Sequence, residues 1–332
     1  GVVSHARPAH FYRSPEARPR ATPMTEKQMT RAIVVQEYGG PEVLRIQDVV
    51  VANPGPGQVR IRHVAIGVNF HDIYVRSGLY KTLALPGTPG VEASGEVTAV
   101  GDDVHHVAVG DRVAYVTGQY GVYAAERLID AETLIRLPAT LSHEAAASVL
   151  ARGLTVEMLL HRVHTVRAGD TVLVQAAAGG VGQLLCQWAS RLGATVIGTA
   201  SAHQVERARA AGCHHVVCYQ TEDVVKRVAE ITDGQGVDVA YDAVGKETFF
   251  QSLESLAFLG QLVNFGQASG SVPPFEVSLL AKRSNSLSRP IIFHYLRDLD
   301  VRDQMAQNVF KAYADGWLRV SEPIEFDLAD AA

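Results

Sequence analysis

Cysteine is scarce in this chain of 332 residues, which contains only Cys186, Cys213 and Cys218. An odd and sparse set argues against a disulfide scaffold and is typical of a reducing compartment. The sequence therefore predicts a cytoplasmic protein in which the three thiols are small buried side chains.

Long runs of one residue kind are missing as well. No apolar stretch approaches the roughly 18 residues that span a bilayer, so we expect no membrane segment. The formal net charge is −5 and no long basic run occurs, which argues against a nucleic-acid partner. Hydrophobic residues make up 47% and charged residues 20%, which is ordinary for a globular chain of about two domains.

The N-terminal segment lacks any apolar period. Residues 1–28 are rich in arginine and proline, and the regular pattern begins only at Met29. We interpret residues 1–28 as a disordered leader, either vector-derived or translated from upstream sequence, with a mitochondrial transit peptide as the alternative.

Two kinds of periodicity follow along the chain. Short alternating stretches such as Gly57–Asn69 predict a β-rich unit, and Ser142 is expected to cap the helix that ends it. From about Arg152, strands alternate with helices, which predicts a parallel sheet with right-handed crossovers. After Arg289 the pattern predicts a strand-like start and then one amphipathic helix.

A turn made of small residues follows the first strand of the alternating region. It has the sequence AAAGGVG over 176–182, and a helical pattern begins at once. Ala177 stands where a dinucleotide fingerprint has its first glycine, Gly179 leaves the backbone open to a pyrophosphate, and Gly182 permits close helix packing. Because the helix N-terminus would then face the phosphates, the turn predicts a dinucleotide site, although a simple tight turn is the alternative.

The end of the second strand bears on the choice of nicotinamide cofactor. Sites for NAD hold the ribose with an acidic residue there, whereas this strand ends at Ser201 and is followed by Arg207 and Arg209. This pattern favours NADPH. Binding of NADH stays open, because either arginine alone could lie on a solvated helix face.

Six motifs occur in an order that is similar to a known family. They are GGPEVL (39–44), VNFHDIYVRSGLY (68–80), PGTPGVEASGEV (86–97), GDRV (110–113), GLTVEMLL (153–160) and AAAGGVGQLLCQWA (176–189). From about residue 31 to 328 the chain resembles the zinc-independent quinone oxidoreductases, the zeta-crystallin-like branch of the medium-chain dehydrogenase/reductase superfamily.

The resemblance implies an α/β fold with two domains. It implies a GroES-like, partly open β-barrel over 29–152 and a Rossmann domain, with a doubly wound parallel sheet, over 153–293. Residues 294–332 are expected to return to the first domain. Family members continue with a further helix and a closing strand, so we expect this last segment to be either truncated or replaced.

The resemblance also implies roles for individual residues. Asn69 and Tyr74 are expected to line the cleft at the nicotinamide as catalytic residues, and Asn69 also to contact the cofactor. His71 is expected to face away from the cleft, because strand neighbours alternate. Arg207 is expected to replace a lysine that relatives carry where this chain has Gln204. The other implied cofactor contacts are Thr155, Ala178, Gly179, Gly180, Val181, Gly182, Ser201, Tyr219, Val244, Phe265, Gly266 and Ala268.

The same comparison of residues predicts that no metal is used. Zinc-dependent relatives carry a cysteine in place of Asn69 and a histidine in place of Val91, and no cysteine precedes Cys186 here. The implied activity is an NADPH-dependent reduction of quinones or other electron-poor acceptors, by a homodimer. The alternatives are an enone or 2-alkenal reductase on the same fold, and a non-catalytic NADPH-binding structural or RNA-binding protein.

Overall fold

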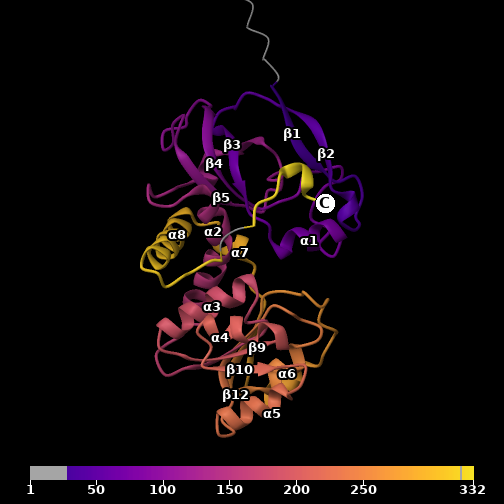
Figure 1. Cartoon of the computed structure of the whole chain (residues 1–332), viewed down its shortest axis with the longest axis vertical. Helices are drawn as coiled ribbons and strands as arrows, with labels where there is room; N and C mark the ends of the chain where they lie inside the picture. Colours follow the sequence, from indigo (N-terminus) through magenta and orange to yellow (C-terminus); the bar gives the residue numbers. More distant parts are fainter. Residues whose placement is uncertain (1–27, 322–323) are drawn as a thin grey trace, which may run out of the picture.

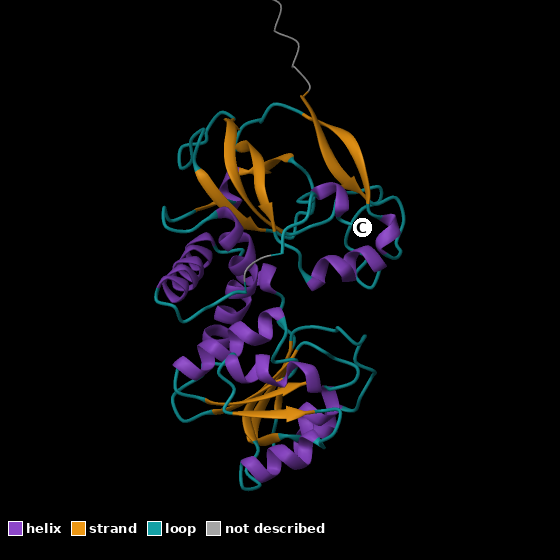
Figure 2. Cartoon of the chain, viewed as in Figure 1, coloured by secondary structure: helices purple, strands orange, loops and turns teal. Residues whose placement is uncertain are grey.

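A computed structural model describes residues 28–321 and 324–332 of the chain. Two lobes lie one above the other along the long axis of the molecule (Figure 1). The first lobe is rich in strands, whereas the second places a sheet among helices (Figure 2). The leader expected over 1–28 lies outside the described residues, apart from Gln28, at which β1 begins.

The first lobe contains two antiparallel sheets. The smaller one pairs β1 (Gln28–Val34) with β2 (Arg45–Val51). The larger one has the order β6-β3-β4-β5-β7, with β3 (Gln58–Ile66), β4 (Glu92–Val100), β5 (Arg112–Val116), β6 (Glu126–Asp130) and β7 (Ile135–Arg136). Val59 and Ile61 of β3 are buried in one core with Val113 and Tyr115 of β5. The alternating pattern therefore predicted this strand correctly.

The segment that follows β3 is a helix. α1 (Phe70–Ser77) begins after Asn69, whose backbone N–H donates to Asp72 Oδ2 at 2.9 Å. It ends at Gly78, which adopts a left-handed φ of 81°. The expected strand alternation across Tyr74 is wrong, because this local carboxylate cap and the glycine end favour a helix.

A long helix joins the two lobes. α2 (His143–Met158) begins at Ser142, whose hydroxyl accepts a hydrogen bond from the Ala145 N–H at 3.1 Å. The predicted cap is thus confirmed. The helix continues as a π-helical segment over Leu159–Val163. The domain boundary expected at 152/153 falls inside α2, and the domain bounds stay a prediction.

The second lobe is built on one six-stranded parallel sheet. Its order is β10-β9-β8-β11-β12-β13, with β8 (Thr171–Val174), β9 (Thr195–Ala200), β10 (His215–Cys218), β11 (Val237–Asp242), β12 (Leu256–Asn264) and β13 (Ser286–Ser288). The helices between the strands are α3 (Gly180–Arg191), α4 (Val205–Ala210), α5 (Val224–Ile231) and α6 (Phe249–Glu254). The strand order turns back at β8, so the carboxyl ends of β8 and β11 form the switch point at which such sheets bind ligands.

Alternate side chains of β8 enter two different cores. Val172 and Val174 pack in the core that contains buried residues of α2 and α3, and Leu173 packs in the core that contains those of α5 and α6. The sheet is therefore covered on both faces, which explains why its strands are almost continuously apolar.

The C-terminal part of the described chain differs from expectation at its start. Residues after Arg289 form α7 (Ile292–Tyr295), a short helix, and the strand β13 precedes Arg289. The strand-like start is therefore wrong. α8 (Leu299–Ala314) packs against α2.

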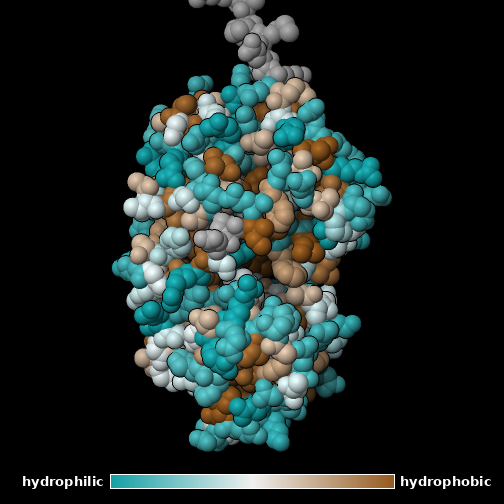
Figure 3. Space-filling model, viewed as in Figure 1, coloured by the Kyte–Doolittle hydropathy of each residue, from teal (hydrophilic) through white to brown (hydrophobic). Residues whose placement is uncertain are grey.

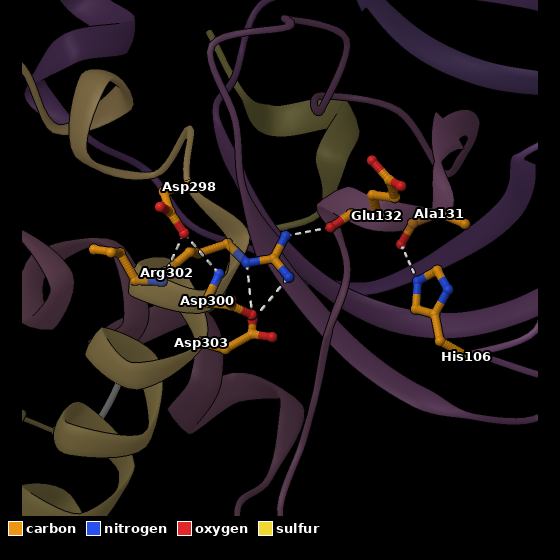
Figure 4. Close-up of polar contacts among 8 residues, drawn as sticks. His106, Ala131, Glu132, Asp298, Asp300, Arg302 and Asp303 are labelled. Carbon is orange, nitrogen blue, oxygen red and sulfur yellow. Dashed lines mark hydrogen bonds and ion pairs between the residues drawn. The ribbon is translucent and has the colours of Figure 1, made fainter.

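Contacts of α8 and the chain end reach the first lobe. Figure 4 shows the guanidinium of Arg302, which donates to the Glu132 carbonyl and pairs with Asp303 at 2.7 Å. The same view shows the Nε2 atom of His106 at 2.8 Å from the Ala131 carbonyl oxygen. The last turn, Leu328–Asp330, lies against β1 and β2. Among the described residues, no helix combines the length and apolar character needed to cross a bilayer.

Candidate functional site

The turn between β8 and α3 exposes backbone where a phosphate group would be expected. Gly179 is the N-cap residue of α3, and it has no side chain that could cap or cover the first N–H groups of the helix. A Cβ on Gly179 would meet only the Ala176 carbonyl oxygen, at 3.2 Å, whereas a Cβ on Gly182 would lie 2.2 Å from that oxygen. Gly182 therefore permits close packing and Gly179 leaves space, which are the two roles that the sequence predicted.

A cation that the sequence analysis did not identify lies beside this turn. Arg152 extends from α2, and its Nε lies 3.0 Å from the position that a Cβ on Gly180 would take. Its guanidinium can thus supplement the helix N-terminus in binding an anion. No sequence signal could have identified it, because Arg152 belongs to a helix that precedes β8.

The residues expected at the adenosine end are brought together by neighbouring strands. Ser201 follows β9 and Tyr219 follows β10, and the Tyr219 N–H donates to the Ala200 carbonyl at 3.3 Å. Ser201 is buried, whereas 53% of Tyr219 is exposed and free to contact a ligand. Arg207 is exposed on α4, where Arg209 pairs with Glu206.

The residues expected beside the nicotinamide lie on two hydrogen-bonded loops. Val244 follows β11, and its carbonyl accepts from Ser269 N–H at 2.8 Å in the loop after β12. The Phe265 N–H donates to the backbone carbonyl of Asp242 at 2.9 Å, and the Ala268 N–H donates to the Ala243 carbonyl at 3.1 Å.

Gly266 and Thr155 have structural partners of their own. A Cβ on Gly266 would lie 2.7 Å from the Ala243 carbonyl oxygen, so glycine is required for the two loops to approach. Thr155, on α2, donates its hydroxyl to the Ala151 carbonyl at 2.8 Å. Ala178 and Val181 belong to the turn at the start of α3: Ala178 is buried, and Val181 packs against the same core.

The second lobe and α1 meet directly at Tyr74. The Gln267 N–H donates to the Tyr74 hydroxyl oxygen at 3.3 Å. Arg289 Nη2 donates to the hydroxyl of Tyr80 at 2.9 Å. Figure 3 shows the surface hollowed between the two lobes, with hydrophobic residues at its rim. Tyr74 therefore lies where a ligand on the second lobe could be contacted from the first.

Asn69 is held by a buried carboxylate. Its Nδ2 donates to Glu92 Oε2 at 3.0 Å, and the Ala151 N–H donates to Glu92 Oε1 at 2.6 Å. Only 2% of Glu92 is exposed, and burial raises its pKa from 4.5 to about 7. A Cβ on Gly67 would lie 2.3 Å from Glu92 Oε2, so the carboxylate fills a space left by glycine.

His71 lies at the junction of the lobes. Its Nε2 contacts the Tyr120 hydroxyl at 3.0 Å, and its ring packs edge-on against Phe293 of α7 at 5.5 Å. The expectation that it faces away is therefore wrong, because a helix and not a strand carries it. Burial lowers its pKa to about 4, so the imidazole is neutral at physiological pH.

A buried polar network lies under the switch point. The Thr199 hydroxyl donates to Gln175 Oε1 at 2.7 Å, and Gln175 Nε2 donates to the Ser252 hydroxyl at 3.0 Å. Ser252 in turn donates to Asp242 Oδ2 at 3.0 Å. The network ties the ends of β8, β9 and β11 to α6, so that each buried polar group is satisfied.

Possible metal ligands do not gather in the described part of the chain. Within residues 28–321 and 324–332, no three His, Cys, Asp or Glu side chains are placed so that they could hold a metal ion. Asn69 and Val91, where zinc-dependent relatives have ligands, supply no thiolate or imidazole.

Two family models match the chain. One, the alcohol dehydrogenase GroES-like domain, matches residues 55–138, and the other, described as zinc-binding dehydrogenase, matches residues 180–308. Together with the antiparallel first lobe and the parallel six-stranded sheet, these matches confirm the predicted fold class.

Curated proteins resemble the chain over almost its whole length. A quinone oxidoreductase of Pseudomonas aeruginosa is 43% identical over 92% of this chain and 94% of that protein. A 2-haloacrylate reductase of a Burkholderia species is 41% identical over 92% of this chain and 94% of that protein. A solved structure of Escherichia coli quinone oxidoreductase complexed with NADPH superposes with a TM-score of 0.88, at 38% identity, over 91% of this chain and 94% of that one.

Proposed function

Since the chain belongs to the quinone oxidoreductase family of the medium-chain dehydrogenase/reductase superfamily, we propose that it is an NADPH-dependent reductase of quinones and other electron-poor acceptors. The observation that carries the proposal is the placement of Tyr74 against the Gln267 N–H. It brings a hydroxyl of the first lobe to the loop that is expected to flank the nicotinamide.

The chain's own residues fit the cofactor. The open backbone at Gly179 and the cation of Arg152 suit a pyrophosphate, and Ser201 and Tyr219 lie together at the strand ends beyond it. Arg207 is exposed on α4, the helix that follows β9, where a 2′-phosphate would be recognised. We therefore propose NADPH as the preferred cofactor, with NADH as a weaker one.

When bound, the nicotinamide supplies the hydride that reduces the acceptor. Tyr74 uses its oxygen to accept from Gln267, which leaves its own O–H free to donate to an acceptor oxygen. Burial raises the pKa of Tyr74, so the phenol stays protonated and remains a donor. One Nδ2 hydrogen of Asn69 is taken by Glu92, and the other is free for the same oxygen. Both donors would stabilise negative charge as it develops, without a metal.

The test is the oxidation of NADPH by 1,4-benzoquinone, followed by the loss of nicotinamide absorbance. Tyr74→Phe should lower kcat by about tenfold to a thousandfold, because it removes one donor to the developing oxyanion. Tyr313→Phe, in α8 and outside the residues expected at the cofactor, is the matched control and should keep the wild-type kcat. Wild-type protein that binds neither NADPH nor NADH would refute the proposal.

A second candidate function is the reduction of enones or 2-alkenals at the same site. The 2-haloacrylate reductase, which is 41% identical, supports it, because its named acceptor is an activated olefin. Steady-state kcat/KM with 1,4-benzoquinone and with a simple enone distinguishes the two. A structural or RNA-binding role would instead require RNA affinity, which a titration at two salt concentrations measures.

We further propose a homodimer in the cytoplasm. The edge strand β13 pairs on one side with β12, and Phe258 and Leu259 nearby are 76% and 78% exposed. Within residues 28–321 and 324–332, no strand pairs with the other edge of β13, and such an edge beside exposed apolar side chains favours pairing with a second copy. The three free cysteines are consistent with a reducing compartment. Sedimentation velocity of the purified chain tests the dimer.

A further inference from the structure

A pocket of about 450 Å³ opens beside the loop that contacts Tyr74. Its size is within the usual range for small-molecule sites. The lining residues are Phe249, Asn264, Gln267, Val272, Pro273, Pro274, Phe275, Leu287 and Arg289. Among these described residues, Arg289 alone carries a charge. The pocket is thus lined mainly by apolar residues, with two amide side chains and one cation among them.

The guanidinium of Arg289 is held in place but is not neutralised. Nη2 donates to the Tyr80 hydroxyl at 2.9 Å, and Nη1 makes long contacts with the carbonyls of Asn264 and Pro290, at 3.4 and 3.5 Å. Within the described residues, no carboxylate lies within 4.0 Å of it. Arginine that keeps free donors beside an apolar pocket is suited to bind a carboxylate in a bidentate manner.

The strand order separates this cation from the turn that is expected to hold the cofactor phosphates. Arg289 follows β13, which lies three strands from β8 in the sheet. Three strand spacings amount to about 14 Å, so the turn at Gly179–Gly182 is far from Arg289. The 2′-phosphate would lie on the other side of β8, near β9 and β10. The charge of Arg289 is therefore left for another ligand.

The two groups that would contact an acceptor lie close to each other. Arg289 donates to the hydroxyl of Tyr80, whose ring centroid lies 5.0 Å from that of Tyr74. Gln267, whose N–H donates to the Tyr74 hydroxyl, also lines the pocket. A small acceptor could thus place its carbonyl at Tyr74 and a second, anionic group at Arg289.

From this arrangement we propose that the acceptor carries a carboxylate and that Arg289 is the residue that selects it. The inference rests on the proposed reductase function and narrows its substrate class to carboxylated, electron-poor olefins and quinones. Arg289 acts by binding the carboxylate, while the apolar walls around Phe275 and Val272 accept the remainder of the molecule.

The experiment compares one acceptor in two charge states. The probes are 4-oxopent-2-enoate and its methyl ester, and the readout is the ratio of their kcat/KM values. The intrinsic reactivity difference between the two compounds is the same for every variant. A change of ratio between variants therefore reports only how the protein treats the negative charge.

Arg289→Gln should lower the carboxylate-to-ester ratio by about tenfold to a hundredfold, because a charge-assisted bidentate contact is lost. Arg289→Lys keeps the charge but not the planar fork, so its ratio should lie between those of Arg289→Gln and the wild type. Lys282→Gln removes one positive charge from the same lobe outside the pocket and should keep the wild-type ratio.

A binding measurement without turnover completes the test. The saturated analogue 4-oxopentanoate should inhibit the wild type more strongly than its methyl ester, and Arg289→Gln should abolish this difference. A ratio in Arg289→Gln within twofold of the wild type would overturn the inference, as would equal inhibition by the two analogues. Activity with 1,4-benzoquinone under the same conditions shows separately whether the proposed reductase function holds.

Discussion

Replacing the carboxylate of Glu92 by an amide should change how the stability of this protein depends on pH. Glu92 is 2% exposed, and burial raises its pKa from 4.5 to about 7. The folded state therefore binds this proton more tightly than the unfolded state does. Stability contributed by the protonated group is present in full below pH 4.5 and is lost as the pH rises to about 7. The difference of about 2.5 pH units corresponds to about 3 kcal/mol.

Glu92→Gln removes this proton equilibrium while keeping the shape of the side chain. The amide can accept from only one of Asn69 Nδ2 and the Ala151 N–H, both of which are donors. The lost hydrogen bond lowers the unfolding free energy of the variant by the same amount at every pH. It therefore does not change how the difference in unfolding free energy between variant and wild type depends on pH.

The assay is urea unfolding of the two proteins between pH 4.5 and 8, followed by tryptophan fluorescence. Relative to the wild type, Glu92→Gln should gain about 3 kcal/mol of unfolding free energy across this range. Glu96→Gln, on the same strand but with 37% of its side chain exposed, is the control and should show no comparable gain. A difference between Glu92→Gln and wild type that is independent of pH would refute the reasoning.

Three further changes have expected outcomes. Gly182→Ala should lower the thermal midpoint and weaken NADPH binding, measured by nicotinamide fluorescence, because the new Cβ would lie 2.2 Å from the Ala176 carbonyl oxygen. Thr199→Val should destabilise the chain by about 1–3 kcal/mol in urea unfolding, since Gln175 Oε1 loses its 2.7 Å donor in a buried site. A thiol reagent should modify Cys218 in the native protein and the two fully buried thiols only after unfolding, and three equally fast thiols would contradict the described burial.

Local sequence patterns were sufficient to predict the elements that are specified by neighbouring residues in the sequence. The turn at 176–182 was identified because a small-residue bend between a strand and a helix has few other uses. The Ser142 cap was predicted because a hydroxyl before an alanine-rich run satisfies free N–H groups locally. Strand–helix alternation likewise indicated the parallel sheet, since each helical crossover returns the chain to the end of the sheet at which the previous strand began.

Two short segments were predicted wrongly from their apolar pattern. The helix α1 replaced an expected strand, because the Asp72 carboxylate caps it and strand periodicity is not continued beyond Ile66. The short α7 replaced the strand-like start after Arg289. In both places a few apolar residues suit either structure, so their pattern alone does not distinguish a short helix from a strand.

By itself, the sequence determined the family, the dinucleotide turn and the lack of zinc ligands at Asn69 and Val91, because each of these is a statement about residue identity at a position. Only the tertiary structure decided that Glu92 holds Asn69, that Arg152 lies beside the turn at 176–182 and that Arg289 lines a pocket next to Gln267. These three depend on side chains from separate elements that meet in space. No local period or spacing records such a meeting, since it is set by how the sheet and the helices pack.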